Sequence, residues 1–181
     1  MNKNMKNELA KRAIFRAQSG FYFLRNIVLP HIRSGTDAAY SRSAYILLSF
    51  NTELVLSALF ILGSKKTLEL EIIGDLITAS KLHNLQNLFG KIPQEFRFGI
   101  QSVVRKNTNE FVRYDIKINN STITIEDLTD VRYDFKKNTS RPVNQKEGND
   151  LRHSTILLLE LVRNIINMSI DFGIHKNHEK T

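Results

Sequence analysis

The sequence predicts a mainly α protein: an up-and-down helical bundle with a small β-hairpin inserted in it. Two patterns predict this class. Over long segments the apolar residues recur every three or four positions, as on one face of a helix, and over one short segment they alternate, as along a strand. The 181 residues, 41% of them hydrophobic, are enough for one domain over 1–181 with a substantial core.

The first predicted helix covers residues 6–29. Apolar residues recur along it at three- and four-residue steps and predict a single buried face: Leu9, Ala13, Ala17, Phe21, Leu24 and Val28. We expect Pro30 to end this helix, because proline has no amide hydrogen and its ring clashes with the preceding turn.

The same region is the most basic part of the chain. Residues 1–33 carry seven lysines and arginines against one acid, so they hold six of the eight net positive charges. A basic first helix is suited to the phosphate backbone of a nucleic acid, and Lys11, Arg12 and Arg16 are the candidate contacts. A solvated helix face is the alternative interpretation of this run of charge.

A second long helix is predicted over residues 38–62, and Gly63 is placed to end it. The segment is long and apolar enough to cross a membrane, but Glu53 lies near its middle. A carboxylate at the centre of a bilayer is costly, so we expect a buried helix of a soluble bundle and no membrane association.

Shorter helices are predicted at 67–82, at 84–90 and, beginning on Pro93, at 93–106. The final predicted helix, 150–171, is rich in leucine and isoleucine on more than one face, so we expect it to be the central, most enclosed helix.

Between these helices the pattern changes. Residues 112–126 alternate polar and apolar about an Asn-Asn-Ser turn, which predicts a small β-hairpin decorating the bundle. The polar segment 136–148 is expected to be a mobile loop, and the polar tail 173–181 is expected to be disordered.

The chain contains no cysteine, which excludes disulfides, thiolate chemistry and cysteine-based zinc sites. Its beginning is charged and does not have the pattern of a secretory signal, so we expect a cytoplasmic protein. The histidines do not have the spacing or the carboxylate neighbours of a zinc site, and the chain has no glycine-rich phosphate loop. We therefore expect neither a metal nor a cofactor.

Three segments resemble the HEPN family, a group of helical bundles that act on or around RNA and nucleotides. They are Phe-Asn-Thr-Glu-Leu-Val-Leu-Ser-Ala-Leu-Phe at 50–60, Leu-His-Asn-Leu-Gln-Asn-Leu-Phe at 82–89 and Val-Arg-Tyr-Asp-Phe at 131–135. They occur in the order typical of the family and together span about half of the chain. The resemblance implies a HEPN-type bundle.

The resemblance also has departures and an open choice. Ser57 stands where the family often has lysine. The tetrapeptide Val-Arg-Tyr-Asp occurs twice, so either Arg113-Tyr114 or Arg132-Tyr133 can match the arginine–tyrosine segment that precedes the last helix of the family. We favour the second, because a polar loop and the final helix follow it directly.

HEPN ribonucleases are similar in using an arginine, a polar residue and a histidine in the last helix, facing a partner subunit. There the histidine transfers protons and the arginine steadies the phosphate. In this chain Arg163 and Asn164 fit the first two positions, but Ser169 stands near where the histidine belongs. Serine cannot replace an imidazole as a base, so the resemblance implies a non-catalytic module that binds RNA, a nucleotide or a partner.

The alternative is an active metal-independent endoribonuclease. Arg25-Asn26 followed by His31 fits the same string, although Pro30 lies between them, and His175 is a second possible imidazole. The resemblance implies a homodimer in a bacterial stress, toxin–antitoxin or phage-defence setting, with a nucleotidyltransferase-like antitoxin as a candidate partner. A third hypothesis gives the basic first helix a membrane-surface or partner-docking role.

Glu53 is the remaining residue of interest, because a carboxylate on an apolar helix must be paired. Arg132 and Arg163 are its candidate partners, and the pair can be a ligand contact or a structural ion pair between helices. His83 is expected to anchor the turn before the helix at 84–90. With Glu53, Arg132 and Tyr133 it completes the candidate ligand- or RNA-binding set.

Overall fold

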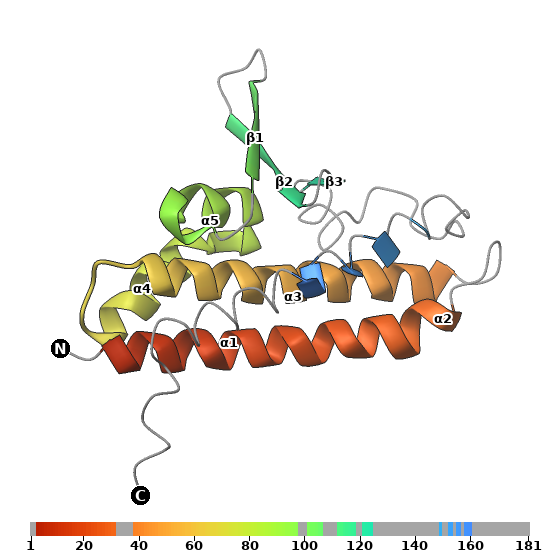
Figure 1. Ribbon diagram of the computed structural model, residues 1–181, viewed down its shortest axis with the longest axis horizontal. Helices are drawn as coiled ribbons and strands as arrows, with labels where there is room; N and C mark the ends of the chain where they lie inside the picture. The colour runs from red at the N-terminus through yellow and green to blue at the C-terminus, as the bar shows by residue number, and fades with distance from the viewer. Residues whose placement is uncertain are drawn as a thin grey trace, which may run out of the picture.

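The computed structural model describes residues 3–31, 38–97, 101–106, 112–118 and 121–124, together with 149, 152, 153, 155, 156 and 158–160. Two long helices, α1 and α3, lie side by side along the length of the molecule, and the shorter helices α4 and α5 cover one end of α3 (Figure 1). The predicted mainly α class is confirmed.

The first helical segment consists of α1 (Lys3–Phe23), a π-helical turn (Leu24–Val28) and α2 (Leu29–His31). This helical segment ends at His31, one residue after the Pro30 that was predicted to end it. The amide of Leu29 donates to the carbonyl of Leu24, five residues back, so the turn before the proline is wider than an α turn. A wider turn gives the ring of Pro30 room beside the preceding carbonyls, and the helix continues through it.

Helix α3 (Ala38–Gly63) ends at the glycine predicted to stop it. It packs against α1 through a continuous apolar layer that is almost completely buried: Ala10, Ile14, Ala17, Phe21 and Leu24 from the first helix, and Leu48, Val55, Leu56 and Leu59 from α3. Burying a leucine or phenylalanine side chain contributes about 1.5–3 kcal/mol, so this layer is a large part of the stability of the fold.

At Gly20, α1 faces the side chain of Asn51 on α3. A Cβ atom at this position would overlap the carboxamide of Asn51 on α3, so a larger residue fits there only if this buried carboxamide moves. Asn51 is buried, and among the described residues its Nδ2 has no hydrogen-bond partner. The apolar layer between α1 and α3 therefore contains a polar group, the carboxamide of Asn51, and Gly20 leaves the space that it occupies.

After α3 the chain forms α4 (Glu69–Ala79), a 3₁₀ turn (Lys81–His83), α5 (Leu85–Lys91) and a second 3₁₀ turn (Gln94–Phe96). Asn84 caps α5, because its side-chain oxygen accepts a hydrogen bond from the amide of Asn87 at 2.9 Å. The buried side chains of α5 are Leu85, Leu88 and Phe89, and this helix packs on α3.

Three strands follow, β1 (Gln101–Lys106), β2 (Val112–Ile118) and β3 (Ser121–Thr124). They form an antiparallel sheet in the order β1-β2-β3, with Val104 opposite Tyr114 and Ile116 opposite Ile123. The helix predicted over 93–106 is therefore wrong beyond Phe96. Strand pairing with β2, which lies outside that segment, outweighs the local pattern. The turn predicted for the hairpin falls on residues 119 and 120, outside the described residues.

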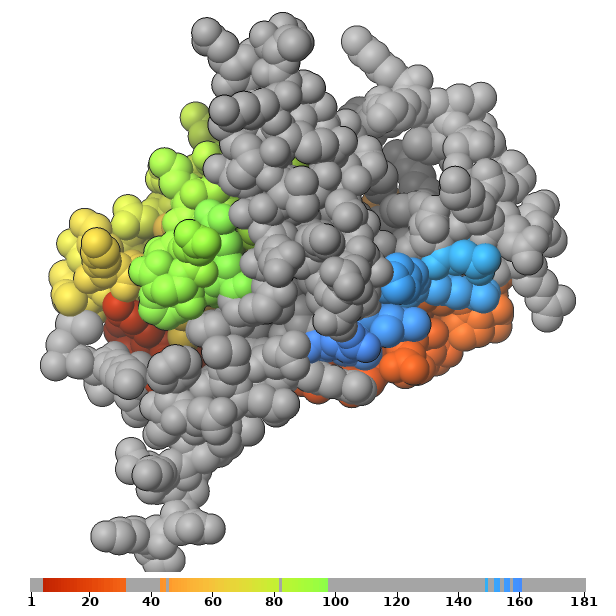
Figure 2. Space-filling model, turned by 45° about the horizontal axis from the view of Figure 1, so that its top comes forward, coloured from red at the N-terminus to blue at the C-terminus, as the bar shows by residue number. Residues whose placement is uncertain are grey.

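The described residues of the last predicted helix are helical and have one buried side. Thr155, Leu158 and Leu159 are buried, whereas Arg152 is exposed. The guanidinium of Arg152 donates to the carbonyl of Leu29 at 3.1 Å, at the end of the first helical segment. Figure 2 shows this blue segment against the orange end of that helical segment. The predicted loop 136–148 and tail 173–181 lie outside the described residues.

We predict that the same substitution has opposite effects at two helical glycines. Gly20→Ala should lower the free energy of unfolding by about 1–3 kcal/mol, because the new methyl group overlaps buried Asn51. Gly74→Ala on α4 should raise it by about 1 kcal/mol, because nothing lies within 4 Å of the added atom and alanine is the better helix former. Urea unfolding followed by circular dichroism measures both.

The double variant Gly20→Ala/Asn51→Ala is the control for the first effect. Removing the carboxamide makes room for the new methyl group, so the double variant should be more stable than Gly20→Ala alone. Equal stability of these two variants would show that the contact does not limit the approach of the helices.

Candidate functional site

Glu53 and His83 form a hydrogen-bonded pair between α3 and the turn that precedes α5. The imidazole Nδ1 lies 3.1 Å from both carboxylate oxygens of Glu53. The Glu53 side chain is 16% exposed and that of His83 is 49% exposed, so the carboxylate lies behind the ring and the ring is at the surface. The carboxylate thereby fixes the orientation of the imidazole.

Hydrogen bonds from side chains to backbone carbonyls hold the turn that carries His83. Ser80 Oγ donates to the carbonyl of Leu76 at 2.8 Å, and Asn87 Nδ2 donates to the carbonyl of Ala79 at 2.7 Å. His83 has a φ of 52°, a left-handed conformation that side-chain-bearing residues rarely adopt. The ring also meets Phe50 edge to face, with 6.3 Å between ring centroids. These contacts hold one histidine in an uncommon backbone conformation.

The prediction that His83 anchors this turn agrees with its pairing with Glu53. The predicted partners of Glu53, Arg132 and Arg163, lie outside the described residues. Sequence reasoning placed Glu53 and His83 in one candidate set but did not pair them. Thirty positions separate the two residues, and no local spacing indicates the contact.

When a carboxylate accepts a hydrogen bond from Nδ1–H, the neutral ring carries no hydrogen on Nε2. Nε2 is then the nitrogen that can accept a hydrogen bond or a proton. Such an imidazole can accept a proton from a hydroxyl or, once protonated, bind a phosphate oxygen. The pair is therefore able to take part in proton transfer or in anion binding.

A second group of candidate residues lies on the side of α1 that is turned away from the core. Arg12, Phe15, Arg16, Ser19 and Phe23 are all exposed there, at three- and four-residue spacing, and we call these five residues the basic face. Phe15 is 50% exposed and Phe23 is 51% exposed.

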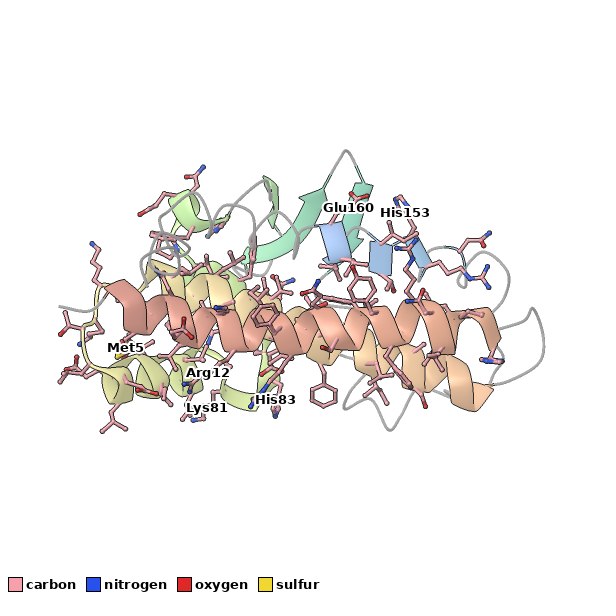
Figure 3. All side chains as sticks on the ribbon, turned by 60° about the horizontal axis from the view of Figure 1, so that its bottom comes forward. Met5, Arg12, Lys81, His83, His153 and Glu160 are labelled. Carbon is pink, nitrogen blue, oxygen red and sulfur yellow. The ribbon has the colours of Figure 1, made fainter. Side chains whose placement is uncertain are left out.

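The predicted contact Lys11 lies at the edge of this face. Its Nζ lies 5.9 Å from the centre of the Phe15 ring and 3.8 Å from a carboxylate oxygen of Glu8, because residues three and four apart are neighbours on a helix. Arg12, Lys81 and His83 point to one side of α1 in Figure 3, whereas His153 and Glu160 lie on the opposite side. In that view Arg12 of the basic face and the histidine turn therefore lie on the same side of α1.

The other predicted site residues are placed as follows. Arg25 is exposed in the π turn and His31 is exposed at the end of α2. Arg132, Tyr133, Arg163 and Asn164 lie outside the described residues, so the last-helix string and the arginine–tyrosine segment stay predictions. In the part of the chain that the structure describes, no group of three metal-ligating side chains occurs.

Among the described helices, α3 contains an 18-residue window, Ile46–Gly63, that is apolar enough to cross a membrane, and half of that window is buried within the protein. Comparison with known proteins gives no match to a family model, to a curated protein or to a solved structure.

We predict that neutral His83 carries its proton on Nδ1. The carboxylate of Glu53 accepts a hydrogen bond from this atom, which stabilises that tautomer. Nitrogen-15 NMR of the imidazole reports the tautomer directly. In Glu53→Ala the population should shift toward the Nε2–H form, and an unchanged spectrum in that variant would show that Glu53 does not set the tautomer.

Proposed function

We propose that this chain is a helical module that binds RNA through the basic face of α1. The observation that carries the proposal is the exposure of arginines and phenylalanines together on one face of one helix. A purely solvated basic face needs no exposed aromatic rings. Two half-exposed phenylalanines among arginines offer both kinds of contact that an RNA strand makes.

The first kind of contact is electrostatic. Arg12 and Arg16, one turn apart, present planar guanidinium groups that bind phosphate oxygens in pairs, and each neutralised phosphate releases condensed counterions. The net charge of +8 adds a long-range attraction for a polyanion.

The second kind of contact is stacking. An unpaired base stacks on an aromatic side chain with a gain of about 1–3 kcal/mol, and any base can do so. Phe15 and Phe23 are eight residues apart, a rise of about 12 Å along the helix. Unstacked bases occur in single strands, loops and bulges, so single-stranded RNA is the form of nucleic acid that this face fits best.

The wider assignment rests on the resemblance to the HEPN family. We propose a HEPN-type bundle in a cytoplasmic protein that serves a bacterial stress or defence function, with Ser169 in place of a catalytic histidine after Arg163 and Asn164. The placement of His83 supports this proposal in one respect. It lies in the segment Leu82-His-Asn-Leu, and its turn opens α5 as the resemblance implies.

We predict that Arg12→Ala/Arg16→Ala weakens binding to a single-stranded RNA oligonucleotide. The slope of log affinity against log salt should fall by about 0.7 for each phosphate that the variant no longer neutralises. Fluorescence anisotropy at several salt concentrations measures affinity and slope together. Lys65→Ala/Lys66→Ala removes the same charge from two exposed lysines outside the basic face and is the matched control. Equal losses of affinity in both variants would refute a specific face.

The Glu53–His83 pair favours a second candidate function, a metal-independent endoribonuclease. A carboxylate-oriented imidazole at the surface is the arrangement that a general base for a 2′-hydroxyl requires. It lies on the same side of α1 as Arg12 (Figure 3).

We predict for this candidate that labelled RNA is cleaved in the presence of EDTA and that His83→Asn lowers the rate at least about a hundredfold, the usual contribution of a general base. Arg12→Ala should instead weaken RNA binding with a smaller effect on the rate at saturating enzyme. If the RNA stays intact after prolonged incubation with the parent protein, the ribonuclease proposal is refuted and the RNA-binding proposal remains.

A further inference from the structure

Helix α4 carries a second exposed surface, of a different character from the basic face. Leu70 is 84% exposed and Ile77 is 65% exposed, and Ile73 between them is also exposed. The opposite side of the helix is buried through Ile72 and Ala79. Residues at i, i+3 and i+7 lie on one face of a helix, so α4 is apolar on both sides. We call Leu70, Ile73, Gly74 and Ile77 the outer face of α4.

Gly74 lies in the middle of this outer face. A glycine within a helix costs about 1 kcal/mol relative to alanine. Nothing lies within 4 Å of a Cβ atom at Gly74, so no close contact within the described part of the chain accounts for the glycine. Ile73 lies beside Gly74, so the glycine leaves a gap on one side of the outer face, where the backbone of a second helix can approach.

Charge indicates what kind of helix fits. Glu69, Glu71 and Asp75 are the charged residues of α4, which has no lysine or arginine, in a chain whose net charge is +8. A helix that packs on the outer face therefore gains from basic residues beside its own apolar side chains.

The basic face of α1 has these properties. Phe15 and Phe23 stand on either side of the small residue Ser19, with Arg12 and Arg16 beside them. The two phenylalanines are about 12 Å apart along α1, and Leu70 and Ile77 are about 10.5 Å apart along α4. The distance between the two large residues at the ends is therefore similar on the two helices.

We propose that α4 of one copy of this chain docks on the basic face of α1 of a second copy, with Gly74 over Ser19. Each copy carries both surfaces, so a two-fold axis lets both contacts form in one closed dimer. In Figure 3 the yellow ribbon of α4 lies on the same side of α1 as the side chain of Arg12, as this pairing requires. One helix contact buries little surface, so the dimer is weak and depends on concentration.

The docking has a consequence for binding. A second copy on the basic face covers the residues proposed to bind RNA, so RNA and dimerisation compete. This competition rests on the proposed function, whereas the docking does not.

Sedimentation velocity of the full chain over a wide range of concentration tests the docking. The parent protein should form a dimer, and Gly74→Gln should lower its association constant at least about tenfold, because a long side chain blocks the close approach. The same change favours the helix, so the variant should unfold at no lower temperature than the parent. Thr78→Gln, at an exposed position beside the outer face, is the matched control and should dimerise like the parent.

A mixing experiment separates this pairing from one in which α4 contacts α4. Arg12→Glu/Arg16→Glu retains the outer face and loses the basic face, whereas Gly74→Gln does the reverse. Each should be monomeric alone, and the mixture should regain association through the one intact contact. A dimer formed by Arg12→Glu/Arg16→Glu alone would overturn the proposal.

Two further outcomes would also overturn it. The first is a parent chain that is monomeric at every concentration. The second is a monomer that floats with vesicles of anionic lipid, which would assign the outer face to a membrane surface. Adding a single-stranded RNA oligonucleotide to the dimer should release monomers bound to RNA. If the dimer does not bind the RNA, the proposed function is refuted and the docking is not. If the RNA binds and the dimer stays intact, only the competition is refuted.

Discussion

The close packing of α1 on α3 is the constraint on which the rest of this structure depends. Gly20 lets the two helices meet at Asn51, and the apolar layer on either side of that point contains the largest buried side chains of α1. Once α3 is fixed against α1, its other sides receive α5 and the turn that carries His83. The inner side of α1 is then committed to the core, and its basic face is left to solvent.

The hydrogen-bonded pair of Glu53 and His83 depends on this arrangement. Glu53 lies on α3 among buried neighbours, and a carboxylate there needs a partner because burial without one is costly. The turn after α4 supplies the imidazole, at the expense of a left-handed backbone conformation. A pair of this kind, partly exposed, contributes little to stability, about 1 kcal/mol or less. Its effect is on the orientation of the ring.

Two surfaces of opposite character result from one small bundle. The basic face combines arginine with exposed phenylalanine, and the outer face of α4 combines isoleucine and leucine with flanking carboxylates. Both leave apolar area in water, which a monomer gains nothing from exposing. The proposed RNA binding would use the first surface, and the proposed docking between two copies would use both.

The sequence by itself determined the helical class, the two long helices and the basic charge of the first, because these depend on periodicity and composition within single segments. It did not predict the π turn before Pro30, and it misjudged the segment 101–106, where pairing with β2 outweighs local preference. Only the tertiary structure decided that Glu53 meets His83, that Gly20 faces Asn51 while Gly74 is open, and that α4 exposes an apolar face. Each of these depends on contacts between segments distant in sequence, about which local pattern carries no information.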